Sequence, residues 1–322
     1  MSISEWRYWI PVIVLSAAVV AQTGNPSVPG DQPVGVSKGA TKIPGILTVP
    51  RQGQRQSGLI VFVQQISLNE DGIDSKETEV LKNLAEALGA GGFASIRYQQ
   101  TSNGGSGTRI GVEPASKIVD DGVAVVQSAP DQIGGTPGPE FLLSYGVAAT
   151  VAPYIAEKSP IRGLILVAPN ILPVETQLAE QTRRDLEKRR TPESEIQEEL
   201  ASQNKILSDI RAGKLPAGRL IEGAPAETWL DWMNRNPAEE LGKLNLPILV
   251  LQAGRDETAT DANSEKLQKA LGTRGPAVEF RLFPNLNHSF SVAASAGGSG
   301  ESDKLDPQVV ATILTWLSRH TH

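Results

Sequence analysis

The chain of 322 residues contains no cysteine and only three histidines. The absence of cysteine excludes disulfides, zinc–thiolate sites, a cysteine nucleophile and a lipid anchor on cysteine. His320 and His322 belong to the C-terminal tail, where frayed residues are expected. His288 is therefore the one histidine expected to take part in catalysis. Three histidines are too few for a histidine-rich metal site, and we expect neither a metal nor a cofactor.

No basic cluster dominates the sequence, and its formal net charge is −6. This balance argues against a nucleic-acid partner. The run "RRDLEKRR" (183–190) is interleaved with acids, which is typical of a solvated helix face. The glycine-rich stretch "TSNGGSGTR" (101–109) lacks the lysine of a phosphate-binding loop, and we interpret Ser106 within it as a loop residue.

An apolar stretch near the N-terminus, "WIPVIVLSAAVVAQ" (9–22), is shorter than the ~20 residues of an ordinary membrane span. It suits the core of a signal peptide, with a small-residue cleavage site at Val19 and Ala21. We therefore expect residues 1–21 to be a signal peptide, residues 22–39 a polar linker, and the protein to be exported. Glu5 offsets Arg7 and Pro11 interrupts the run, so an uncleaved anchor, with membrane contact, is the alternative.

Short apolar runs alternate with helical patterns along most of the chain. Strands are expected at 45–50, 58–65, 93–99, 141–145, 163–169, 247–254 and 278–284, and helices at 75–92, 116–129, 147–158, 262–272 and 307–320. Such alternation predicts an α/β fold with a mostly parallel sheet of about seven or eight strands and helices on both faces. The core is expected in two parts, residues 40–169 and 246–322.

Residues 170–245 break this alternation, because they hold charged, helix-like sequence and no strand pattern. Binding sites in parallel sheets lie beyond the carboxyl ends of the strands. We therefore interpret the segment as a helical lid over a ligand; a bundle with no role at the site is the alternative. Trp229 and Trp232 give a third possibility, an interaction protein that uses these side chains as contact anchors.

The stretch "EFLLSYGVAATVAP" (140–153) reads as a strand, a small-residue corner and the start of a helix. This is the pattern of the G-x-S-x-G nucleophile elbow, with Gly146 where the serine belongs. Asp256 follows a later strand and His288 follows the last one, which gives the chain order of α/β-hydrolases. An aspartate there would hold the imidazole in one tautomer and stabilise its charged form.

From about residue 40 to residue 318 the chain resembles the α/β-hydrolase superfamily, and most closely an exported branch related to dienelactone hydrolases and serine acyl-peptidases. The motifs are "GILTVP", "SIRYQQ", "FLLSYGVAATVAPYIA", "GLILVAP", "PILVLQAGRDE" and "LFPNLNHSF". The resemblance implies hydrolysis of ester or peptide bonds. The departures lie together. Gln64 and Gln65 replace the His-Gly of the oxyanion loop, Gln99 replaces an aspartate, Ser144-Tyr145-Gly146 replaces Gly-His-Ser, and Ala148 and Ala149 replace a glycine pair.

Glycine adopts the strained elbow conformation without steric cost but has no hydroxyl. Ser144 is expected to be a small residue at a tight contact, and the N–H of Val147 can still act as an oxyanion donor. The leading hypothesis is thus an exported, catalytically impaired hydrolase homologue that binds a small molecule, peptide or partner. The alternative is an active ester or peptide-bond hydrolase that uses Ser144 or a water activated by His288 and Asp256.

Overall fold

The computed structural model describes most of the chain beyond the N-terminal segment. The described residues are 30–51, 53–63, 75–98, 113–133, 138–216, 219–221, 224–258, 261–272, 277–292 and 304–321. Within these ranges no helix is long and apolar enough to cross a membrane. The expected signal peptide, residues 1–21, lies outside them.

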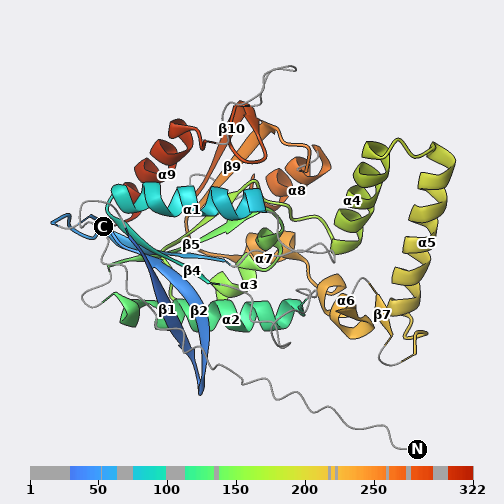
Figure 1. The fold of residues 1–322 in the computed structure, drawn as a ribbon, viewed down its shortest axis with the longest axis horizontal. Coiled ribbons are helices and arrows are strands. Elements are labelled where there is room, and N and C mark those ends of the chain that lie inside the picture. Colours follow the sequence, from blue (N-terminus) through green and yellow to red (C-terminus); the bar gives the residue numbers. More distant parts are fainter. Residues whose placement is uncertain are drawn as a thin grey trace, which may run out of the picture.

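An eight-stranded sheet forms the centre of the molecule (Figure 1). Its order is β1-β2-β4-β3-β5-β6-β9-β10, and only the β1–β2 and β2–β4 pairs are antiparallel. The strands are β1 (Asp31–Lys38), β2 (Thr41–Thr48), β3 (Gly58–Phe62), β4 (Phe93–Tyr98), β5 (Glu140–Tyr145), β6 (Gly163–Val167), β9 (Ile248–Arg255) and β10 (Val278–Asn287). The mostly parallel α/β architecture predicted from the alternating pattern is confirmed.

Helices cover both faces of this sheet, and each face has its own apolar core. On one face α1 (Ser75–Ala90) and α9 (Pro307–His320) pack in the first core. On the other face α2 (Ala115–Ser128), α3 (Ala152–Glu157) and α8 (Asp261–Leu271) pack in the second. Strands β3 and β6 are fully buried, which explains their uninterrupted apolar sequences.

The first strand corrects the expected linker at residues 22–39, because Asp31–Lys38 pairs along its whole length with β2. Pro33 and Gly35 made this stretch resemble a loop. The strand tolerates both because it is the last one on its side of the sheet, where a proline need not donate a ladder hydrogen bond. Val36, fully buried in the core on the α2 face, fixes which side of the strand points inward.

The end of the chain also differs from expectation, since His320 is not frayed. It is the last residue of α9, and its ring lies 4.4 Å from the ring of Trp316, measured between centroids. The His320 Nδ1 lies 2.8 Å from the Trp316 carbonyl oxygen. Trp316 is buried in the core between α9 and the sheet, and this contact extends the order to the helix end.

The segment between β6 and β9 is largely helical, as its composition predicted. It contains α4 (Val174–Lys188), α5 (Glu193–Arg211), α6 (Ala226–Met233) and α7 (Pro237–Lys243), with the two-residue strands β7 (Leu220–Ile221) and β8 (Ala224–Pro225). Helices α4 and α5 pair and stand to one side of the sheet (Figure 1). The buried Asn263 fixes the backbone at the start of this segment. Its side-chain amide donates to the Pro169 carbonyl and accepts from the Ile171 N–H.

Trp229 and Trp232 do not form contact anchors on the surface. Each is 1% exposed, and both belong to the core that α2 and α3 share with the sheet. Their indole N–H groups donate to backbone carbonyls, Trp229 to Ile221 and Trp232 to Glu113. The helical period placed both on the inner face of α6, so an interaction surface built on these two side chains is excluded.

Candidate functional site

The elbow is formed as a sharp turn at the end of β5. Gly146 has a φ of +56°, and a 3-10 helix, η2 (Gly146–Thr150), follows directly. The continuous helix expected over 147–158 is divided here, because Pro153 has no N–H to continue the helical hydrogen bonds. A Cβ built on Gly146 would lie 3.8 Å from the His288 Nε2 and 3.9 Å from its Cε1. A side chain at position 146 would therefore face the imidazole.

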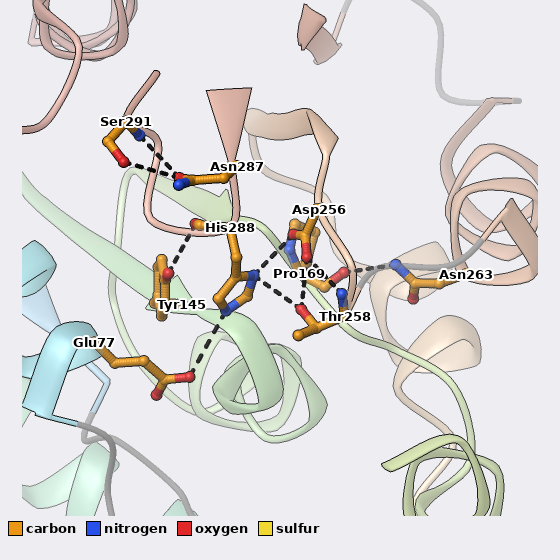
Figure 2. A network of polar contacts seen from close by, with 9 residues as sticks. All are labelled: Glu77, Tyr145, Pro169, Asp256, Thr258, Asn263, Asn287, His288 and Ser291. Atoms are coloured by element: carbon orange, nitrogen blue, oxygen red, sulfur yellow. Dashed lines mark hydrogen bonds and ion pairs between the residues drawn. The ribbon is translucent and has the colours of Figure 1, made fainter. Parts of the chain in front are cut away.

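Asp256 and His288 meet as expected. Asp256 follows β9 and His288 follows β10, and these strands are parallel neighbours, so their carboxyl ends share one edge of the sheet. The Gly254 position helps them to approach, since a Cβ there would lie 2.6 Å from the Pro284 Cα. The His288 Nδ1 lies 2.8 Å from the Asp256 Oδ2 (Figure 2). The predicted hydrogen bond between the two residues is confirmed.

Thr258 completes the support of Asp256. Its N–H and its hydroxyl both donate to the Asp256 Oδ1, at 2.8 and 2.7 Å, and the same hydroxyl oxygen lies 2.9 Å from the His288 Nδ1. The Asp256 side chain is 1% exposed, so these donors compensate for the lost hydration of its carboxylate. The sequence could have predicted the bond from the Thr258 N–H to Asp256, because Asp-x-Thr is typical of an Asx turn.

A second carboxylate faces the other side of the His288 ring. Glu77, in the first turn of α1, has its Oε1 3.7 Å from the His288 Nε2. This distance is that of an ion pair rather than of a good hydrogen bond. Figure 2 shows the imidazole between the two carboxylates, with Asp256 at one ring nitrogen and Glu77 at the other. Sequence reasoning missed Glu77.

The contacts around Asp256 and His288 shift the pKa values of both side chains. Burial raises the pKa of the Asp256 carboxyl, but its hydrogen bonds and charge interaction with His288 and Thr258 outweigh burial and lower the pKa below its usual value. Burial lowers the pKa of the His288 imidazole, but the interactions with Asp256 and Glu77 outweigh it and raise the pKa to about 9. At neutral pH His288 is therefore an imidazolium, a hydrogen-bond donor at both nitrogens.

Tyr145 holds the backbone and the ring of His288 from β5. Its hydroxyl donates to the His288 carbonyl oxygen at 2.8 Å, and the two ring centroids lie 5.0 Å apart. On the far side of His288, Asn287 accepts hydrogen bonds from the N–H and hydroxyl of Ser291, which closes the loop (Figure 2). The position of the imidazole is thus fixed by residues on both sides of it.

The remaining residues singled out from the sequence have different outcomes. Ser144 is fully buried, and its hydroxyl has no hydrogen-bond partner among the described residues. It therefore makes no hydrogen bond to His288, and the geometry gives no support to Ser144 as a substitute nucleophile. Val147 is the second residue of η2, where a backbone N–H has no acceptor within the helix and can donate to a ligand. Gln64, Gln65 and Ser106 lie outside the described residues.

The model of the serine aminopeptidase family, S33, matches residues 75–292. Esterase EstD of Thermotoga maritima is 24% identical over 285 residues, which cover 85% of this chain and 65% of that esterase. The chain thus spans less than two thirds of this relative.

Solved structures with the same architecture include esterases and a lipase. An esterase of Pyrococcus furiosus aligns over 91% of this chain and 92% of its own, with a TM-score of 0.60 and 13% identity. A soluble variant of a monoglyceride lipase of Saccharomyces cerevisiae aligns over 92% and 97%, with a TM-score of 0.58 and 16% identity. Est1E of Butyrivibrio proteoclasticus aligns over 89% and 98%, with a TM-score of 0.55 and 12% identity. At such low identity, these structural similarities show a shared α/β-hydrolase fold and nothing beyond it.

Proposed function

The chain belongs to the serine aminopeptidase S33 family of α/β-hydrolase-fold proteins, and on this premise we propose that it binds an acyl compound without hydrolysing it. The ligand class is a small molecule or peptide with an ester or amide carbonyl, as the resemblance to dienelactone hydrolases and serine acyl-peptidases suggests. The helical segment α4–α7 acts as its lid, and the protein works outside the cytoplasm after loss of its signal peptide.

One observation carries this proposal: the residue at the elbow is a glycine whose Cβ direction points at the His288 Nε2, 3.8 Å away. In serine hydrolysis the hydroxyl oxygen at this place attacks the carbonyl carbon and its proton passes to the imidazole. Gly146 has no atom that can attack. The elbow conformation, the histidine and the aspartate remain, and together they form a binding site with an imidazolium donor.

The imidazolium gives the site a way to hold a carbonyl group. The His288 side chain is 21% exposed, and its Nε2 lies 3.7 Å from Glu77, too far for a good hydrogen bond, so the Nε2–H can donate to a bound molecule. A hydrogen bond from a charged donor contributes roughly 1.5–3 kcal/mol, about twice that of a neutral one. The N–H of Val147 supplies a second donor beside the same turn. A carbonyl oxygen fits two such donors, whereas an ammonium group does not.

Hydrolysis by an activated water is the second candidate, and the names of the esterases with this fold favour it. A general base must be unprotonated, and His288 has a pKa of about 9. At pH 7 only roughly 1% of the molecules would hold a neutral imidazole. Water-based hydrolysis would therefore be weak at neutral pH and would rise tenfold per pH unit towards pH 9.

The test separates binding from turnover. We would measure hydrolysis of p-nitrophenyl acetate, p-nitrophenyl butyrate and amino-acid p-nitroanilides between pH 6 and 10. In parallel, the His288 ring protons would be followed by NMR during titration with the matching non-hydrolysable amides. The proposal expects perturbed ring signals without turnover, and no perturbation at a matched His320 signal. Turnover that rises towards pH 9 and is lost in His288→Asn would contradict the binding proposal and support hydrolysis by an activated water.

A further inference from the structure

We propose that Glu77 is a positioning residue that keeps the His288 Nε2 protonated through an ion pair, beside the place of the missing elbow hydroxyl. The inference rests on the proposed function, since it concerns the same site. It adds that the site differs from a working triad at two linked positions, Gly146 and Glu77. A serine restored at position 146 alone would meet an imidazole already paired with a carboxylate.

The geometry supports this competition at one atom. An imidazole Nε2 has a single hydrogen-bonding direction, occupied by either a proton or a lone pair. Both the Glu77 Oε1, at 3.7 Å, and the Cβ position of residue 146, at 3.8 Å, lie close to this nitrogen. Asp256 and Thr258 engage the Nδ1, so the Nε2 is the only ring nitrogen left for either partner.

Glu77 is held in place by the helix that carries it. Helix α1 presents Val80, Leu84 and Leu88 to the core on its face of the sheet, and each is at most 3% exposed. Its first turn therefore cannot move far from the imidazole. The Glu77 side chain itself is 30% exposed, so its interaction with His288 is only partly screened by solvent.

The simpler explanation for Glu77 is a helix effect. An acidic side chain in the first turn stabilises a helix through the macrodipole, by about 0.3–1 kcal/mol. This role would change helix stability but would leave the ionisation of His288 almost unaltered. Glu79, two residues further along α1 and exposed, offers a matched control, because among the described ion pairs of His288 the acidic partners are Glu77 and Asp256.

The charge of Glu77 also decides what a serine at position 146 could do. When a serine reacts with a fluorophosphonate, its Oγ forms a bond to phosphorus and fluoride leaves. The hydroxyl proton must pass to the Nε2. A protonated Nε2 that is ion-paired with Glu77 cannot accept it. Among the described residues, the titratable groups that face the ring of His288 are Asp256 from the β9 end, Glu77 from α1 and Tyr145 from β5.

The first experiment follows the His288 ring protons by NMR between pH 5 and 11 in the wild-type protein, Glu77→Gln and Glu79→Gln. The proposal expects the His288 midpoint to fall by about one pH unit or more in Glu77→Gln, and to stay within a few tenths of a unit in Glu79→Gln. Equal midpoints in all three proteins would overturn it. This readout needs no serine, so it does not depend on whether the elbow can be repaired.

The second experiment restores the hydroxyl. Labelling by a fluorophosphonate at pH 7 would be compared in Gly146→Ser, in Gly146→Ser with Glu77→Gln, and in Gly146→Ser with Glu79→Gln. One pH unit in the His288 midpoint corresponds to about tenfold in the neutral imidazole, so the Glu77 double variant should label about tenfold faster than the other two. Equal rates in all three would overturn the role of Glu77. Labelling of the wild-type protein would instead overturn the proposed function.

Discussion

The strongest quantitative prediction concerns stability between pH 6 and pH 10. The His288 pKa is raised from an ordinary 6.5 to about 9 in the folded protein. A group with a raised folded pKa contributes its full stabilisation below pH 6.5, and this is lost as the pH rises through 9. The difference of about 2.5 pH units corresponds to about 3 kcal/mol of unfolding free energy.

Guanidinium denaturation at pH 6, 7, 8, 9 and 10 would measure this loss. The wild-type protein is expected to lose about 3 kcal/mol of unfolding free energy across the series, with most of the loss above pH 7. His288→Asn should start less stable and show a much flatter profile, whereas His320→Asn should keep the wild-type slope. A slope in His288→Asn as steep as that of the wild-type protein would refute the ion-paired imidazolium.

Three further predictions follow from the described contacts and from the N-terminal sequence. Gly146→Ala should fold and be about 1–2 kcal/mol less stable by denaturant titration, since its Cβ has room but its φ of +56° is strained for alanine. An unchanged midpoint would show that this turn relaxes freely. Trp232→Ala should lose about 3–5 kcal/mol in the same assay, because a buried indole and its hydrogen bond are removed. A cost below about 1 kcal/mol would contradict the buried position. On export, mass spectrometry should find a chain that begins at Gln22, whereas an intact Met1 in the membrane fraction would favour the anchor.

Continuous apolar runs predicted the central strands of the sheet, because these strands are buried on both faces. The runs at β3 and β6 are apolar without interruption, so their assignment as strands did not depend on context. Strand β1 could not be predicted in the same way. Its Pro33 and Gly35 have loop propensities, and only pairing with β2 makes the stretch extended.

The same distinction explains what was predicted of the site. Asp256 and His288 each follow a strand, so the parallel sheet brings them to one edge and their contact followed from chain order. Glu77 lies far from both in the sequence, in a helix turn where acids are common for local reasons. Its contact with His288 depends on how α1 packs over the sheet, which no local pattern reports.

The central claim, that this site has no nucleophile, is tested most directly by a single measurement. The purified wild-type protein would be incubated with excess fluorophosphonate at pH 8, and its mass would be measured by intact-mass spectrometry. An active serine esterase of the same fold would serve as the positive control. The account predicts full labelling of the esterase and an unchanged mass for this protein. A gain of one phosphonyl group, mapped to Ser144 or Ser106, would contradict it.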